Sequence, residues 1–200
     1  MSEYVVFGGA RSRAMRVLWM LEELGLDYAV VPTLPRSEDV RALNPTGKIP
    51  VLVEDGVAIS DSVAIMTYLA DKHGRLTAPA GTIARAQQDA FVQAVNDEID
   101  AVLWAAARHS FILPEEQRVA GVKDSLRWEF ARNEDAIADR MSADGPFVMG
   151  EEMCLADILL SHCVGWAGSA KFDARNDRLL AHNAMMRARP AFKRALAAGT

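Results

Sequence analysis

The sequence of 200 residues contains only two cysteines, Cys154 and Cys163, and no CxxC pair. On one helix their separation corresponds to a rise of roughly 13 Å, which is too long for a disulfide bond. The four histidines show no metal-ligand spacing with cysteine or acidic residues. We therefore expect two reduced thiols in a cytoplasmic protein, and no metal site.

Long apolar runs and an excess of positive charge are also missing. The longest apolar runs, such as Val17–Leu21, are far shorter than the roughly 20 residues that cross a bilayer. The first ten residues lack the basic and apolar regions of a secretory signal. The formal net charge is -5 and the basic residues are dispersed, so no nucleic-acid-binding surface is expected. Membranes and nucleic acids are thus excluded as expected partners.

The first third of the chain mixes strand and helix patterns. Tyr4–Phe7 is a short apolar run typical of a strand buried on both faces. An apolar stripe predicts a helix over Ser12–Leu24, and Tyr28–Val31 follows as a second strand, parallel to the first. The elements expected next are a helical turn at Asp39–Leu43, strands at Pro50–Val53 and Val57–Ile59 joined by an Asp-Gly turn, and a helix opened by Ser60 or Asp61. The order β-α-β-α-β-β-α is that of a thioredoxin-like α/β domain.

A short stretch rich in proline, glycine and alanine, residues 77–82, separates this part from an all-helical remainder. We predict a thioredoxin-like domain over residues 1–76, a linker at 77–82 and an all-α domain over residues 83–200. The helices expected in the second domain are Ile83–Ala107, Gln117–Met141, Leu155–Trp166, Leu179–Ala188 and one after Pro190.

The segment Gly47–Leu52 places Pro50 at the start of an apolar strand. If the Ile49–Pro50 bond is cis, the backbone of Ile49 turns outward and can pair with an extended peptide ligand. The alternative is a trans proline that only marks the start of the strand.

Asp61 and Ser62 stand at the start of a predicted helix. The free N–H groups and the dipole of a helix N-terminus favour a carboxylate, and Asp61 can accept a hydrogen bond from an ammonium group. The pair therefore suits the head group of a zwitterionic amino acid. The alternative is simple helix capping, for which both residue types are well suited.

Ser12 lies between Arg11 and Arg13, just after the first strand and before the first helix. A hydroxyl at a helix N-terminus between two cations can favour the thiolate of a bound thiol, because such surroundings lower thiol pKa values. The alternative is a capping serine with two solvated arginines.

Five segments together resemble the cytosolic glutathione S-transferase family over nearly the whole chain. They are RVLWMLEELGLDY (Arg16–Tyr28), LNPTGKIPVL (Leu43–Leu52), SDSVAIMTYLAD (Ser60–Asp71), CLADI (Cys154–Ile158) and RARPAFKRAL (Arg187–Leu196). The resemblance implies a homodimer that uses glutathione as substrate. It also implies a pocket for a hydrophobic electrophile between the two domains.

The resemblance gives roles to individual residues. Ile49 and Pro50 match the pair whose backbone binds the cysteinyl residue of glutathione, and Ser62 matches the serine that binds the γ-glutamyl carboxylate. Asp61 stands where the family usually has a longer Glu or Gln. The candidates for the glycyl carboxylate are Lys48 and Arg36.

The catalytic position departs from part of the family. Phe7 stands where some classes have a catalytic tyrosine, and its ring has no hydroxyl to donate. Other classes use Ser or Cys just before the first helix, and that position falls on Arg11 or Ser12. Ser12 is our candidate, because no other residue of Gly8–Met15 has a hydroxyl or thiol. Activation by Arg11, Arg13 and backbone N–H groups stays open.

In the helical domain, CLADI resembles the family's helix-capping box, in which Asp157 accepts the backbone N–H of the first residue. Cys154 replaces the usual hydroxyl residue, and we assign both residues a structural role. Four aromatic residues are candidates for the electrophile pocket: Trp104, His109, Phe111 and Trp166.

The predicted function is conjugation of glutathione to a hydrophobic electrophile. One alternative is a glutathione-dependent peroxidase, disulfide reductase or isomerase on the same fold. Another is a non-catalytic protein that binds glutathione or another ligand, because a fold alone does not fix a function.

Overall fold

A computed structural model describes residues 4–200, and within them four strands form one mixed sheet in the order β2-β1-β3-β4. The first strand, β1 (Tyr4–Phe7), is parallel to β2 (Tyr28–Val31) and antiparallel to β3 (Val51–Glu54). β3 in turn is antiparallel to β4 (Val57–Ser60). The parallel pair confirms the predicted strand-helix-strand unit.

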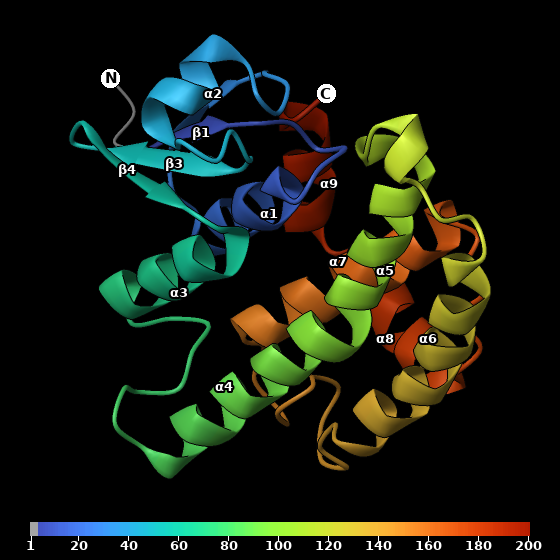
Figure 1. The fold of residues 1–200 in the computed structure, drawn as a ribbon. Helices are drawn as coiled ribbons and strands as arrows, with labels where there is room; N and C mark the ends of the chain where they lie inside the picture. Colours follow the sequence, from blue (N-terminus) through green and yellow to red (C-terminus); the bar gives the residue numbers. More distant parts are fainter. Residues whose placement is uncertain (1–3) are drawn as a thin grey trace. The chain divides into compact units, whose positions relative to one another are not determined.

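The helices of this unit follow the order expected of a thioredoxin-like domain. α1 (Ala14–Leu24) and α3 (Ser62–His73) lie on one face of the sheet, and α2 (Glu38–Leu43) lies on the other (Figure 1). The predicted order β-α-β-α-β-β-α is therefore confirmed.

One expectation about burial was wrong. Tyr4 and Val6 are buried, but Val5 and Phe7 are only partly buried. Alternate residues of a strand point to opposite faces of a sheet, and the six-residue α2 covers only part of one face.

The turn between β3 and β4 forms as the Asp-Gly pair predicts. Asp55 and Gly56 both have positive φ, at 49° and 78°. This is the backbone of a type I′ turn, whose twist matches that of the two strands it joins. The turn and the strand pairing together fix which residues of β3 and β4 face each other.

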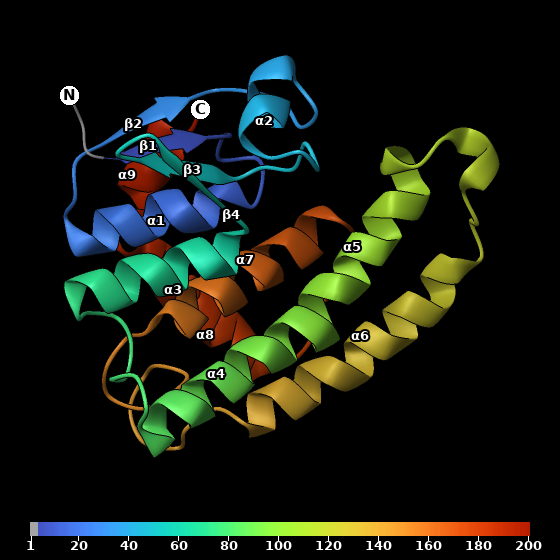
Figure 2. The ribbon, with the colours of Figure 1, turned by 60° about the vertical axis from the view of Figure 1, so that its left-hand side comes forward.

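The chain forms two compact units, one extending up to Ala80 and including Met186–Thr200, the other Gly81–Met185. The junction at Ala80 lies inside the predicted linker, residues 77–82. The end of the chain, which we expected in the helical domain over residues 83–200, belongs to the first unit. The reason is that α9 (Pro190–Ala198) packs along α1 (Figure 2).

Two ion pairs and an aromatic contact fasten α9 to α1. Arg189 donates from Nε and Nη2 to the two carboxylate oxygens of Glu23, at 2.6 and 2.8 Å. The rings of Trp19 and Phe192 meet edge to face, with centroids 4.8 Å apart. Arg194 adds a bond to Glu22. The contact between Arg189 and Glu23 is bidentate, and bidentate ion pairs are stronger than those with a single hydrogen bond.

The second unit is built on a long helical run that lies beside α6 (Figure 2). The run was predicted as one helix, Ile83–Ala107, but its hydrogen bonding widens to a π-helical turn at Asn96–Asp100, and a second such turn continues the run from Arg108 to Ile112. α6 begins later than the predicted Gln117, because a 3-10 turn follows Pro114. The elements of this unit are α4 (Ile83–Val95), η1 (Asn96–Asp100), α5 (Ala101–Ala107), η2 (Arg108–Ile112), η3 (Glu115–Gln117), α6 (Val122–Asp139), α7 (Leu155–Ser169) and α8 (Asp177–Ala188), whose last residues extend into the first unit.

α7 is the most deeply buried helix of this unit, and its sequence is strongly apolar. Ala156, Ile158, Leu159 and Leu160 are all fully buried. Over residues 4–200, no helix combines the length and the apolar character needed to cross a bilayer. The same residues contain no group of three His, Cys, Asp or Glu side chains placed to hold a metal ion.

Candidate active site

The register of the sheet brings three predicted motifs to one end of the first unit. Phe7, the last residue of β1, pairs with Val51, the first residue of β3. Val51 also pairs with Ser60, the last residue of β4. The segments beyond these three residues therefore leave the sheet at the same end. They contain the candidate residues Ser12, Ile49 and Ser62.

A close contact joins the first two of these segments. A Cβ placed on Gly8 would lie 3.4 Å from Cβ and Cδ1 of Ile49. The Ile49 side chain thus lies against the start of the loop that contains Ser12. The Ile49–Pro50 peptide bond is cis, which decides between the two alternatives for Pro50.

The segment before Ile49 is held by a buried amide. Nδ2 of Asn44 donates to the carbonyl oxygen of Lys48 at 2.9 Å. Oδ1 of Asn44 accepts from the backbone N–H and the hydroxyl of Thr46, at 3.2 and 2.9 Å. Because this side chain is hydrogen-bonded at both ends, it fixes the backbone that leads into the cis bond. The sequence analysis did not identify Asn44.

The Ser12 hydroxyl is held within its own loop. It donates to the carbonyl oxygen of Gly9 at 2.9 Å and accepts the N–H of Ala14 at 3.1 Å. The backbone N–H of Ser12 also donates to Gly9 O, at 3.1 Å. If the hydroxyl turned to another acceptor, Gly9 O would therefore keep a hydrogen bond. Of the flanking cations, Arg11 is exposed and Arg13 is partly buried.

The end of α9 holds the other side of this loop. The N–H of Ala10 donates to the carbonyl oxygen of Gly199 at 2.8 Å. Neither glycine at this crossing has room for a side chain: a Cβ on Gly9 would lie 2.9 Å from Gly199 O, and one on Gly199 would lie 2.7 Å from Ala10 N. The loop position is thus set by a residue near the other end of the chain.

We expect Gly199→Ala to lower turnover about tenfold, because the added methyl group displaces the loop that contains Ser12 and small displacements near reacting groups are costly. The same crowding should lower stability by about 1–3 kcal/mol. Steady-state kinetics and thermal unfolding measure the two effects. Gly168→Ala is the matched control, since a Cβ there meets no atom within 4 Å. Unchanged turnover in Gly199→Ala would show that α9 does not position the loop.

At the third segment, Asp61 is the helix cap and Ser62 is the first helical residue. Oδ1 of Asp61 accepts the N–H groups of Val63 and Ala64 at 2.9 and 3.1 Å, and Asp61 has a positive φ of 76°. The capping role is therefore observed for Asp61. Ser62 is buried, with an exposed fraction of 2%, and its hydroxyl accepts a bond from Arg16.

The two candidates for the glycyl carboxylate come from neighbouring loops. The N–H of Arg36 donates to the carbonyl oxygen of Gly47 at 2.7 Å, directly before Lys48. Both basic side chains are exposed. Their backbones are thus fixed while their charged ends face solvent.

The four predicted pocket aromatics all lie in the helical unit. Trp104 and Trp166 are partly buried, whereas Phe111 is 67% exposed. Nδ1 of His109 accepts the N–H of Val119 at 3.1 Å. The His109 ring therefore stabilises the backbone at Val119. The assignment of the four residues to a common pocket stays a prediction.

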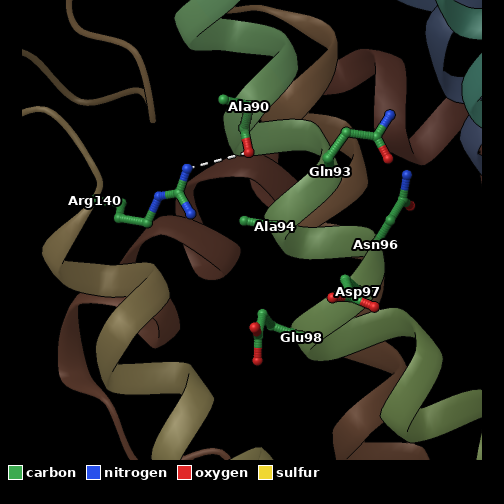
Figure 3. A pocket seen from close by; sticks show the side chains of 7 residues that line it. All are labelled: Ala90, Gln93, Ala94, Asn96, Asp97, Glu98 and Arg140. Atoms are coloured by element: carbon green, nitrogen blue, oxygen red, sulfur yellow. Dashed lines mark hydrogen bonds between the residues drawn. The ribbon is translucent and has the colours of Figure 1, made fainter.

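An open cavity of about 550 Å³ lies between α4, η1 and the end of α6 (Figure 3). Its lining is mostly polar, and Nη2 of Arg140 donates across it to the carbonyl oxygen of Ala90 at 3.2 Å. None of the four aromatic candidates lines it. The lining residues are Ala90, Gln93, Ala94, Asn96, Asp97, Glu98 and Arg140.

The predicted capping aspartate of α7 has more partners than we expected. Oδ2 of Asp157 accepts the N–H of Cys154 at 2.8 Å, as predicted, and Oδ1 accepts the N–H of Val148 at 2.8 Å. Nε2 of the buried His182 lies 2.8 Å from the same Oδ1. His182 was not predicted from the sequence, because no local pattern links it to Asp157, which lies 25 positions earlier. Burial raises the pKa of the Cys154 thiol well above its usual range, which fits a structural role.

Comparison with known proteins identifies the relatives of this chain. Residues 11–72 match the family model of the glutathione S-transferase N-terminal domain. Glutathione S-transferase GstA of Escherichia coli O157:H7 is 27% identical, over 95% of this chain and 94% of the relative. The maleylacetoacetate isomerase of Rattus norvegicus is 26% identical, over 85% of this chain and 79% of the relative. The crystal structure of a glutathione transferase from Methylococcus capsulatus strain Bath has a TM-score of 0.86 and 26% identity, covering 98% of each chain.

A thioredoxin-like unit with a cis-proline before its third strand, followed by an all-helical unit, defines the glutathione transferase fold. The matched N-terminal domain and the full-length relatives agree with this class. Residues 11–72 thus belong to the N-terminal domain family of the glutathione S-transferases, which confirms the resemblance in sequence, and the chain as a whole has the glutathione transferase fold.

Proposed function

We propose that this chain is an enzyme that conjugates the thiol of glutathione to a hydrophobic electrophile. The observation that supports this most is the meeting of three segments at one end of the sheet, through the pairing of Phe7, Val51 and Ser60. An extended tripeptide has a backbone to pair with Ile49, a carboxylate for the start of α3, and a thiol between them. The names of the relatives favour the same ligand.

In this proposal the γ-glutamyl group binds at the start of α3. Its carboxylate accepts the N–H and the hydroxyl of Ser62, where the helix dipole favours negative charge. Oδ1 of Asp61 is engaged in capping, which leaves Oδ2 to accept from the ammonium group. Lys48 and Arg36 bind the glycyl carboxylate at the other end.

Ser12, assisted by Arg11 and Arg13, activates the thiol. The Ser12 hydroxyl turns from Gly9 O to the sulfur and donates to the thiolate, while the backbone bond to Gly9 O is kept. A cationic setting and a helix N-terminus add to the effect by lowering the thiol pKa. The thiol proton passes to solvent, and the thiolate sulfur then forms a bond to the electrophile, by adding to an activated double bond or by displacing a leaving group such as halide. Trp104, His109, Phe111 and Trp166 accommodate the electrophile.

We expect Ser62→Ala to weaken glutathione binding by about 10- to 100-fold, because a hydrogen bond to a charged group contributes about 1.5–3 kcal/mol. Turnover at saturating glutathione should change little. Calorimetry measures the dissociation constant, and Ser60→Ala, which removes an exposed hydroxyl two residues earlier, is the control. An unchanged dissociation constant would reject this assignment of Ser62.

The relatives named maleylacetoacetate isomerase favour a second candidate, an isomerase that uses the same glutathione thiol. Parallel assays with an aryl halide, maleylacetoacetate, a hydroperoxide and a mixed disulfide separate conjugation from isomerase, peroxidase and reductase activity. Retention on immobilised glutathione without thiolate absorbance and without turnover would instead indicate a non-catalytic binding protein.

The proposal includes a homodimer in the cytoplasm. The family resemblance supports the dimer, and the two cysteines, both of them free thiols, fit a reducing compartment. Light scattering after size-exclusion chromatography tests the dimer, and fractionation of the source cells tests the location.

A further inference from the structure

Arg16 is a buried cation in an otherwise apolar part of α1. Its exposed fraction is 1%, and its neighbours Met15, Val17 and Leu18 are buried apolar residues. The guanidinium group keeps its charge at every physiological pH. Burial of a charge is unfavourable unless hydrogen bonds and opposite charges compensate for it.

The guanidinium group of Arg16 contacts the candidate active site through the buried side chain of Ser62. Nη1 of Arg16 donates to Oγ of Ser62 at 3.2 Å, and both side chains are buried. The bond joins α1 to the first residue of α3, and these two helices pack on each other. The positive charge of Arg16 is therefore in direct contact with the side chain of the first residue of α3.

This bond decides what the Ser62 hydroxyl can do. A hydroxyl has one hydrogen to donate and two lone pairs, whereas a guanidinium group can only donate. The bond from Arg16 occupies a lone pair and leaves the hydroxyl hydrogen for an acceptor. Among residues 4–200, the Ser62 hydroxyl has no other hydrogen-bond partner. An acceptor from outside the chain can therefore take this hydrogen.

The charge also favours an anionic acceptor. The dipole of α3 places partial positive charge at its first residues, and the guanidinium group of Arg16, which also interacts elsewhere in the structure, adds positive charge next to them. Electrostatic interactions are stronger in a buried setting than in water. A ligand carboxylate at the start of α3 is therefore stabilised by both the helix dipole and the Arg16 charge. A ligand that lacks this carboxylate is stabilised by neither.

We propose that Arg16 is a positioning residue, which orients the Ser62 hydroxyl outward and makes the site specific for a γ-glutamyl group with a free α-carboxylate. The inference rests on the proposed function, since it concerns the same glutathione site. Arg16 acts through Ser62 and need not touch the ligand.

The test compares two ligands in calorimetry: glutathione and γ-aminobutyryl-cysteinyl-glycine, which lacks only the α-carboxylate of the γ-glutamyl group. The ratio of their dissociation constants is measured for the wild type and for Arg16→Gln, Arg16→Lys, Ser62→Ala and the double variant Arg16→Gln/Ser62→Ala. We expect the wild type to prefer glutathione by about 30-fold or more, and Arg16→Gln to reduce that preference about tenfold. Arg16→Lys, which keeps the charge but not the planar fork, should lie between them.

The ratio of the two dissociation constants shows whether Arg16 positions the Ser62 hydroxyl or only stabilises the structure. Loss of a structural bond between α1 and α3 would weaken both ligands equally and leave the ratio unchanged, and that result would overturn the proposal. In the Ser62→Ala background, Arg16→Gln should change the ratio clearly less than it does in the wild type, because the hydroxyl that Arg16 orients is gone and only the direct effect of its charge is left. If Arg16→Gln does not fold, an unchanged ratio in Arg16→Lys overturns the proposal in the same way. A wild type that binds neither ligand would refute the proposed function itself.

Discussion

Replacement of Ser12 by alanine is expected to lower the turnover of glutathione conjugation by about 10- to 100-fold. The hydroxyl is the one group of Gly8–Met15 that can donate from a side chain to the sulfur without carrying a charge. Its loss removes about 1.4–2.7 kcal/mol of stabilisation of the thiolate and of the transition state that follows from it. Glutathione affinity should stay within about twofold, because the contacts at Ile49 and Ser62 are unaltered.

The thiolate itself provides the sharper measurement. Its ultraviolet absorbance, followed as a function of pH, gives the pKa of the bound glutathione thiol. In Ser12→Ala this pKa should rise by about one to two units, so the thiolate fraction falls at neutral pH and recovers in alkali. Ser125→Ala is the control, because it removes an exposed hydroxyl from α6. If both the rate and the thiol pKa are unaltered in Ser12→Ala, activation belongs to Arg11, Arg13 and the backbone.

The largest expected effect on stability is that of Asp157→Ala. The fully buried carboxylate accepts the N–H groups of Val148 and Cys154 and pairs with His182. Its removal leaves these buried donors without an acceptor, and loss of one partner of a buried pair costs about 3–5 kcal/mol. We expect the thermal midpoint to fall by roughly 10 °C or more.

Two variants test this account of Asp157. Asp139→Ala removes an exposed aspartate from the same unit and should change stability by less than about 0.5 kcal/mol. In a His182→Phe background, Asp157→Ala should cost less than in the wild type, because one of the three contacts is already absent. A midpoint for Asp157→Ala within about 2 °C of the wild type would contradict the buried network.

The sequence predicted the parts of the site that depend on neighbouring residues. The proline at position 50 and the polar pair at 61 and 62 stand where a strand or a helix begins, and strand and helix starts are visible in local patterns. The cis bond and the Asp61 cap follow that reading. Ser12 was found by exclusion, because the other residues between β1 and α1 lack a hydroxyl.

Contacts between distant segments were not predictable in the same way. Gly199 holds the loop at Ala10, Arg16 holds Ser62, and His182 holds Asp157. Each contact joins residues that are far apart in the sequence, and none produces a periodic pattern or a short motif. Arg16 in particular resembles any charged residue of an amphipathic helix until its burial is known.

The sequence by itself determined the order of the strands and of α1 to α3 in the first unit, the turn at Asp55 and Gly56, and the resemblance to the glutathione S-transferases, because propensity, periodicity and motif spacing are local properties. Only the tertiary structure decided that α9 belongs with the first unit, that Phe7, Val51 and Ser60 stand in one row, and that a buried guanidinium group lies behind Ser62. These features depend on the pairing of strands and the packing of helices. Pairing and packing are set by the whole set of buried contacts, which no short stretch of the chain specifies.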